Sequence, residues 1–237
     1  MPSLNDIHST TVSVARYGRG VFAFAPASDP VQPLELYEFE VCPYCRKVRE
    51  TLTEFDIDYV SRSSARGSGS RNEAIALGGK PQFPFLHDPN TGAQMYESED
   101  IVDYLHATYG AKGPRARWRR WLSPLDNASS AVASGLRLRN RHVRPGMEDR
   151  AQPPQRLELW SFEGSPYCRK VREELSALGL DTLVHNVGKR GRKRSALVAK
   201  GGKMQVPYLV DPNTGAAMYE SDDIVAYLRR TYGPATN

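Results

Sequence analysis

Two short segments of the chain have nearly the same sequence and carry reactive side chains. Residues 41–47 are VCPYCRK, and residues 164–170 are GSPYCRK. Two cysteines separated by two residues can exchange disulfides or bind a metal. A serine hydroxyl cannot exchange disulfides at neutral pH, so the spacing predicts thiol chemistry at Cys42 and Cys45 only. Ser165 and Cys168 must have another role.

Metal binding is the weaker interpretation of these cysteines. A structural zinc site takes four ligands, usually from two closely spaced pairs, whereas this sequence has three cysteines in total. Its five histidines are scattered along the chain. We therefore expect no metal site and assign the cysteine pair to redox chemistry.

The two reactive segments belong to a long internal repeat. Cys168 follows Cys45 by 123 positions (168 − 45). At the same offset, LELYEF from 34 aligns with LELWSF from 157, and DPNTGAQMYESEDIVDYL aligns with DPNTGAAMYESDDIVAYL. Further upstream, residues 3–16 resemble residues 124–137 at an offset of 121. A repeated unit of this length indicates duplicated domains.

Sequence patterns predict the order βαβαββα in each repeat. LELYEFE alternates as a strand, Pro43 suits the first turn of a helix, and Val48, Leu52 and Phe55 form its apolar stripe. IDYVSR is the second strand, residues 64–70 form a Gly/Ser-rich loop, and NEAIALGG is a short helix. FPFLHD and AQMYE form a hairpin, and a last helix has Ser98 at its N-cap and Gly110 after its end.

This order resembles the thioredoxin fold in its glutaredoxin and glutathione S-transferase N-terminal form. CPYC matches the glutaredoxin active-site tetrapeptide, QFP and QVP match the cis-proline triplet, and YES before an acidic residue resembles the transferase motif for the γ-glutamyl end of glutathione. The resemblance implies an α/β protein with two tandem thioredoxin-like (glutaredoxin-type) βαβαββα domains, each with an additional N-terminal helix. We place the first domain at 1–110, a basic connector at 111–123 and the second domain at 124–237.

The position of Cys42 predicts an acidic thiol without reference to the family. The thiol comes just before the first turn of a helix, where unpaired N–H groups and the helix dipole favour a thiolate. Arg46 and Lys47 follow one turn later. A lower thiol pKa chiefly improves the thiolate as a leaving group, because nucleophilicity falls with pKa. We therefore assign Cys42 as the nucleophile and Cys45 as the thiol that resolves a mixed disulfide.

The resemblance also implies glutathione-binding residues in both repeats. Phe83, beside a cis Pro84, would pair with the glutathione backbone, and Glu97 with Ser98 would hold the γ-glutamyl group; Lys80 and Lys203 are candidates for the glycine carboxylate. In the first repeat the implied residues are Tyr44, Lys80, Phe83, Pro84, Glu97 and Ser98. In the second repeat they are Ser165, Tyr167, Cys168, Lys203, Val206, Pro207, Glu220 and Ser221.

Three functions remain open at this point. The leading one is a glutathione-dependent thiol-disulfide oxidoreductase with glutathione as co-substrate and a glutathionylated or disulfide-containing substrate. The second is a glutathione S-transferase-like enzyme in which Ser165 donates a hydrogen bond to the glutathione thiolate. The third is a non-catalytic module that binds glutathione or an iron-sulfur cluster through Cys42. If the second repeat has lost its activity, Cys168 is simply a small buried residue.

Charge and hydropathy limit the other functional classes. The net charge is +5, concentrated in RARWRR at 115–120 and GKRGRKR at 188–194. Such runs usually face solvent, and no nucleic-acid motif accompanies them. No apolar run approaches the length of a membrane span, and no signal-peptide pattern is present, so we expect a cytoplasmic protein without membrane or nucleic-acid partners. Packing of the two repeats as an internal pseudo-dimer would make further oligomerisation unnecessary.

Overall fold

The computed structural model describes residues 20–24, 28–111 and 141–234. Within these residues each repeat has the predicted order βαβαββα. In the first repeat the elements are β1 (Leu34–Glu38), α2 (Pro43–Glu54), β2 (Tyr59–Ser63), α3 (Gly69–Gly78), β3 (Phe85–Asp88), β4 (Ala93–Met95) and α4 (Ser98–Thr108). In the second they are β5 (Leu157–Ser161), α7 (Pro166–Ala177), β6 (Thr182–Asn186), α8 (Arg194–Gly201), β7 (Tyr208–Asp211), β8 (Ala216–Met218) and α9 (Ser221–Tyr232). The expected helices at 3–16 and 124–137 and nearly all of the connector lie outside the described residues.

Two boundaries differ from the sequence prediction. α3 begins at Gly69, inside the Gly/Ser-rich stretch that we expected to be a loop, because Ser68 already has the extended conformation of an N-cap. The N-cap of α4 is Glu97 and not Ser98. Glu97 has a φ of 65°, which ends the preceding extended chain, so Ser98 becomes the first helical residue.

Each repeat is a three-layer unit. Alternate residues of a strand face opposite sides of the sheet, so Leu36 packs on α2 and α4, whereas the next residue, Tyr37, packs with Ala74 of α3. The second repeat is built in the same way, with α7 and α9 on one face and α8 on the other. The predicted helix stripe of Val48, Leu52 and Phe55 is confirmed, because all three side chains are in the core beneath α2.

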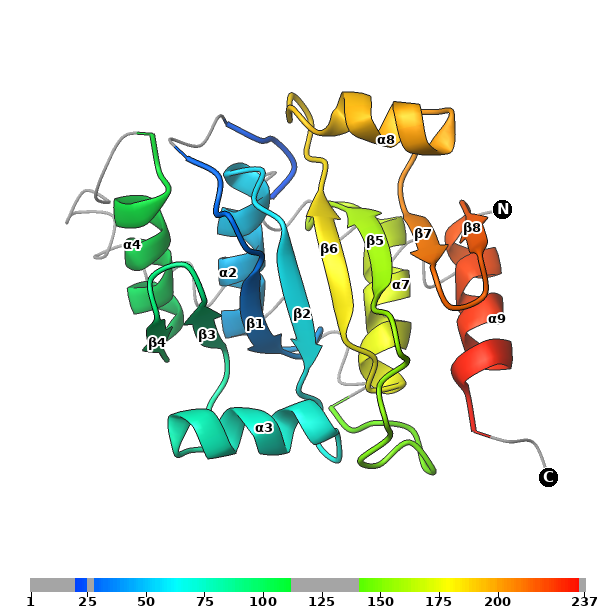
Figure 1. Cartoon of the computed structure of the whole chain (residues 1–237), viewed down its shortest axis with the longest axis horizontal. Helices are drawn as coiled ribbons and strands as arrows, with labels where there is room; N and C mark the ends of the chain where they lie inside the picture. Colours follow the sequence, from blue (N-terminus) through cyan, green and yellow to red (C-terminus); the bar gives the residue numbers. More distant parts are fainter. Residues whose placement is uncertain (1–19, 25–27, 112–140, 235–237) are drawn as a thin grey trace.

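The two repeats share one continuous eight-stranded sheet. The strand order is β4-β3-β1-β2-β6-β5-β7-β8, with β2 and β6 paired antiparallel at the centre (Figure 1). The central pair is Val60 with Leu183, which are equivalent positions, since 183 − 60 = 123. A pseudo-twofold axis therefore passes between these two residues. The arrangement is the internal pseudo-dimer anticipated from the repeat.

A cluster of buried charges lies between the repeats on the α2 and α7 side of the sheet. Arg49 of α2 donates from Nε to Glu163 at 2.8 Å, and the equivalent Arg172 of α7 donates from Nε to Glu40 at 2.9 Å. Each arginine thus crosses to the carboxylate of the other repeat. Arg49 also pairs with Glu38 of its own repeat. These side chains are nearly inaccessible to solvent. A buried charge is strongly destabilising unless it is paired, so each of them needs an ion-pair partner.

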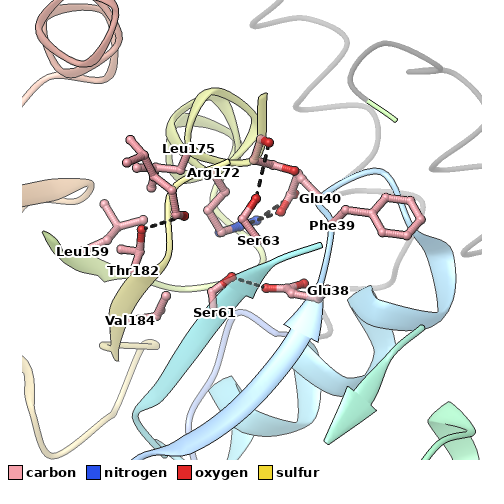
Figure 2. Close-up of a pocket in the computed structure, with 12 residues that line it drawn as sticks. Glu38, Phe39, Glu40, Ser61, Ser63, Leu159, Arg172, Leu175, Thr182 and Val184 are labelled. Carbon is pink, nitrogen blue, oxygen red and sulfur yellow. Dashed lines mark hydrogen bonds and ion pairs between the residues drawn. The ribbon is translucent and has the colours of Figure 1, made fainter. Parts of the chain in front are cut away.

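A small cavity with both polar and apolar lining adjoins this cluster. Its volume is about 20 Å³, which is enough for about one water molecule. Figure 2 shows that the hydroxyls of Ser61 and Ser63 and the carboxylates of Glu38 and Glu40 line it, together with Arg172 from the other repeat. The Ser61 hydroxyl donates to Glu38 at 2.8 Å. Polar side chains of both repeats therefore meet around this cavity, together with apolar ones such as Leu159 and Leu175.

The second basic run, at 188–194, is less solvated than its sequence suggested. Lys193 pairs with Asp58 of the first repeat at 2.7 Å, and the backbone N–H of Arg192 donates to Asp56 at 2.8 Å. The run therefore contributes to the contact between the repeats, because both carboxylates follow α2 in the first repeat.

Two segments cross from one repeat to the other, and we call residues 20–24 and 141–149 the crossing segments. Ala23 N–H donates to the carbonyl of Lys189 at 2.8 Å, while Val143 N–H donates to the carbonyl of Arg66 at 2.9 Å. Lys189 and Arg66 are equivalent, since 189 − 66 = 123. Residues 20–24 precede β1 and bond to the second repeat, whereas residues 141–149 precede β5 and bond to the first repeat. The two repeats are therefore interlaced.

The charge cluster predicts a large stability effect of Glu163→Gln. Burial alone would raise the pKa of Glu163, but Arg172, Arg49 and Arg46 outweigh it and hold the pKa well below the ordinary value. The variant leaves buried guanidinium groups uncompensated, so we expect the free energy of unfolding at pH 7 to fall by about 3–5 kcal/mol in urea denaturation. Because the folded-state pKa is depressed, this contribution is complete above the unfolded pKa of about 4.3 and is lost as the pH falls further.

Glu158→Gln is the matched control for this measurement. Its carboxylate is partly exposed and pairs with the exposed Lys200 at 2.7 Å, so its loss should cost less than about 1 kcal/mol. Equal stability of wild type and Glu163→Gln at pH 7 would contradict the role of the cluster.

Candidate functional site

Cys42 caps the N-terminus of α2. It has extended backbone angles (φ −74°, ψ 119°), and Pro43 is the first helical residue, a position that tolerates proline because no N–H is needed there. The Sγ of Cys42 accepts a hydrogen bond from the backbone N–H of Cys45 at 3.3 Å. The predicted placement of this thiol at the helix N-terminus is confirmed. Cys42 and Cys45 are both free thiols.

The environment separates the acidities of the two thiols. Burial opposes ionisation of Cys42, but hydrogen bonds from the Cys45 thiol and from the N–H groups of Cys45 and Tyr44, with the charge of Arg49, lower its pKa below the ordinary value. Burial raises the pKa of Cys45 well above its ordinary value, and the neighbouring Cys42 raises it further. Of the two thiols, Cys42 is therefore the one that ionises more readily.

The cationic support for this thiolate differs from the sequence prediction. We expected Arg46 and Lys47 to favour it, but Arg46 lies 3.4 Å from Glu163 and Lys47 pairs with Glu99. Arg49 is the cation whose charge acts on Cys42. The expectation was wrong because the first turn of α2 is buried against other elements, so its charges meet carboxylates instead of the thiol.

A groove of about 430 Å³ opens beside Cys42, where α2 approaches the loop before β3. This volume lies in the usual range for small-molecule sites. Its lining residues are Phe39, Val41, Cys42, Pro43, Tyr44, Arg66, Arg71, Pro81, Gln82, Phe83 and Arg141. Tyr44 is half exposed at the rim, and Cys42 is 4% exposed at the base. The site is therefore a groove with a recessed thiol.

Three of the predicted first-repeat residues, Cys42, Tyr44 and Phe83, line this groove. The Phe83–Pro84 peptide bond is cis, as expected, with Phe83 in the groove lining and Pro84 buried behind it. Glu97 accepts a hydrogen bond from Gln82, which itself lines the groove. The start of α4 thus lies next to one end of the groove. Glu97 adopts a left-handed φ of 65°, a conformation that is uncommon outside glycine and concentrates at functional sites.

Lys80 lies apart from the other candidates. Its Nζ is 4.6 Å from the centre of the Tyr96 ring, and it is not among the groove-lining residues. The equivalent Lys203 stacks on Tyr219 in the same way, at 4.5 Å. In both repeats this lysine makes a cation–π contact.

The second repeat keeps the same backbone geometry around a serine. Ser165 caps α7, and its Oγ accepts a hydrogen bond from the N–H of Cys168 at 3.2 Å. Cys168 is fully buried. The remaining candidates are arranged as in the first repeat, with a cis Val206–Pro207 bond, a left-handed Glu220, a buried Ser221 and an exposed Tyr167. The Cys-to-Ser exchange therefore changes the chemistry of the position and preserves its structure.

Sequence reasoning missed the arginines of the groove. Arg66 lies in the loop that we treated only as Gly/Ser-rich, and Arg71 lies in the first turn of α3. Arg141 belongs to the crossing segment of the second repeat. No local pattern marks Arg141, because its place in the groove depends on the packing of one repeat on the other.

The described residues contain neither a cluster of metal-binding side chains nor a helix that could span a membrane. No group of three or more side chains from histidine, cysteine, aspartate and glutamate converges there on a possible metal position. No helix among them has the length and apolar character needed to cross a bilayer.

The hydrogen bond from Cys45 predicts how the acidity of Cys42 responds to substitution. In a Cys168→Ala background, Cys45→Ala removes a thiol donor and should raise the pKa of Cys42, whereas Cys45→Ser keeps a donor and should change it less. Ultraviolet absorbance of the thiolate against pH measures this. We expect the parent to ionise below the free-cysteine value of about 8.5. Identical titrations of all three proteins would contradict the assigned hydrogen bond.

The comparisons with known proteins agree with this geometry. The family model described as glutathione S-transferase, N-terminal domain matches residues 36–114 and again residues 159–236. Glutathione S-transferase GstB from two Escherichia coli strains is 31% identical over 120 residues, which are 45% of this chain and 55% of the relative. The match thus spans about half the length of these relatives. A solved structure, Leishmania TDR1, titled a unique trimeric glutathione transferase, has 15% identity and a TM-score of 0.31, covering 87% of this chain and 68% of that one. Because the family model matches both repeats and more than half of the sequence, the chain belongs to the glutathione S-transferase N-terminal domain family, with two thioredoxin-like domains in tandem.

Proposed function

We propose that the protein is a glutathione-dependent thiol-disulfide oxidoreductase that works through its first repeat. The observation that supports this most is the Cys42 thiol, which caps α2, has a lowered pKa and lies at the base of a groove. Family membership supports glutathione as the co-substrate. The second repeat lacks a cysteine at the equivalent position, so the redox chemistry belongs to one site per chain.

The reaction follows from the position of the thiolate. Cys42 attacks the glutathionyl sulfur of a mixed disulfide, a Cys42–glutathione disulfide forms, and the substrate sulfur leaves with the electron pair and takes a proton from water. A second glutathione thiolate then attacks the glutathionyl sulfur bound to Cys42. Glutathione disulfide is released and the Cys42 thiolate is regenerated. The lowered pKa of Cys42 accelerates this second step, because a stabilised thiolate is a better leaving group.

Glutathione is held along the groove in this proposal. The backbone of Phe83 pairs with the peptide in the manner of an added strand. The N–H groups at the start of α4 and the Ser98 hydroxyl receive the γ-glutamyl carboxylate, while Glu97 takes its ammonium. The hydrogen bond from Gln82 to Glu97 supports this arrangement, since it ties that carboxylate to the groove.

Cys45 has the smaller role in resolution. It is fully buried, and burial raises its pKa well above the ordinary value. Few Cys45 thiolates are therefore available to attack the mixed disulfide. Glutathione is the main resolving thiol, and Cys45 acts chiefly as a hydrogen-bond donor to Cys42.

This division of roles predicts opposite effects of two serine variants. Cys42→Ser should abolish turnover of a small glutathione mixed disulfide, whereas Cys45→Ser should retain most of it, in an assay coupled to reduction of glutathione disulfide. Cys168→Ser is the matched control and should behave as wild type. Unchanged activity of Cys42→Ser would refute the proposed function.

A second candidate activity concerns Ser165. Its hydroxyl oxygen accepts from Cys168 N–H, so its own proton is available to donate to a glutathione thiolate. This arrangement supports glutathione binding in the second repeat, as required for a transferase that conjugates glutathione to an electrophile.

Calorimetric titration counts the working sites. We expect wild type to bind two glutathione molecules, and Ser98→Ala and Ser221→Ala each to weaken one site by about 2 kcal/mol, or roughly thirtyfold, because a hydrogen bond to a carboxylate is lost. A single site that only Ser98→Ala affects would leave the second repeat without a binding role.

A further inference from the structure

Three arginines line the groove at Cys42, and we call Arg66, Arg71 and Arg141 the arginine wall. Arg66 follows β2, Arg71 is in the first turns of α3, and Arg141 comes from the crossing segment of the second repeat. The site of the first repeat is therefore completed by the other repeat.

Backbone hydrogen bonds hold Arg141 in this wall. Arg66 N–H donates to the carbonyl of Arg141 at 2.9 Å, and Val143 N–H donates to the carbonyl of Arg66 at 2.9 Å. Asp149 N–H donates to the carbonyl of Gly67 at 2.8 Å, which fixes the far end of the same segment. The crossing segment thus lies along the Arg66 loop as a short strand-like ladder.

The charges of the arginine wall are not neutralised within the described part of the chain. There, no carboxylate lies within ion-pair distance of Arg66, Arg71 or Arg141. Arg71 donates from Nη1 to the Ser64 carbonyl at 3.0 Å, and its Cζ lies 4.6 Å from the centre of the Phe83 ring. Burial lowers the pKa of Arg71, and the charge of Arg66 lowers it further. Arg49 and Arg172, which lie between the repeats, are by contrast paired with carboxylates.

The second repeat has a weaker counterpart. Lys189 and Arg194 occupy the positions equivalent to Arg66 and Arg71, at the repeat offset of 123 (189 − 66 and 194 − 71). The backbone ladder aligns Val21 with Arg141, because Lys189 N–H donates to the carbonyl of Val21 at 2.7 Å. An apolar residue therefore replaces the third arginine. All three positions are therefore arginine only in the repeat that contains Cys42, and not in the repeat that contains Ser165.

We propose that the arginine wall binds carboxylates on the substrate half of a mixed disulfide, so that the preferred substrates are glutathione mixed disulfides of acidic thiols. This inference rests on the proposed function. Glutathione has two carboxylates, and the γ-glutamyl one is assigned to the start of α4. The glycine carboxylate can occupy one guanidinium in a bidentate pair. Two of the arginines that line the groove with Cys42 then remain for the other half of the disulfide.

Three stable thioethers test this preference without turnover: S-(3-carboxypropyl)glutathione, S-butylglutathione and S-(3-aminopropyl)glutathione. Calorimetry at low salt should show the carboxypropyl compound binding roughly fivefold more tightly than the butyl compound, with the aminopropyl compound weakest. The difference should shrink at high salt, since exposed charges are screened. Arg141→Gln should remove most of the difference in affinity between the carboxypropyl and butyl compounds, and Arg141→Glu should favour the aminopropyl compound.

Arg230→Gln is the matched control, because it removes the same charge from exposed α9. It should keep the wild-type preference. Equal binding of the three compounds to wild type, or no binding of any, would overturn the inference. Activity on a neutral mixed disulfide with no preference for carboxylate-bearing compounds would leave the proposed function standing while the arginine wall loses its role.

Discussion

The reciprocal guanidinium–carboxylate contacts between the two repeats are the constraint on which the rest of the structure depends. Arg49 reaches Glu163 and Arg172 reaches Glu40, and all four side chains are buried and take part in ion pairs that cross between the repeats. Separating the repeats would strand these charges in an apolar setting. The same contacts hold Arg49, whose charge acts on Cys42. The second repeat thereby influences the acidity of a thiol that it does not contain.

The two repeats show how one scaffold separates structure from chemistry. Cys42 and Ser165 have nearly the same backbone angles and accept the same backbone hydrogen bond. The helix N-terminus needs only an acceptor at this position, and both sulfur and oxygen provide one. The thiolate chemistry therefore depends on one atom, the sulfur of Cys42. The surrounding fold is the same when an oxygen takes its place, as in Ser165. The wall of the groove differs more, because Arg141 and Val21 come from segments outside the core.

The sequence was sufficient for the parts of the fold that follow from local pattern. Element order and the helix-capping Cys42 were predicted because each depends on a few neighbouring residues, and the cis prolines were predicted from the resemblance to the family. The roles of Arg46 and Lys47 were wrong, since the partners of a buried charge are set by distant segments. Glu163 and Arg141 were not identified for the same reason. Their importance arises at the seam between the repeats, and periodicity within one repeat contains no information about that seam.

Because of the crossing segments, the boundary between the domains in space does not coincide with the boundary between the repeats in the sequence. Residues 141–149 are bonded to the Arg66 loop, and residues 20–24 are bonded to the Lys189 loop. A cut placed between the sequence repeats would remove from each half a strip of backbone that belongs to it structurally. The natural unit for dissection, circular permutation or recombination with a relative is therefore the whole interlaced pair.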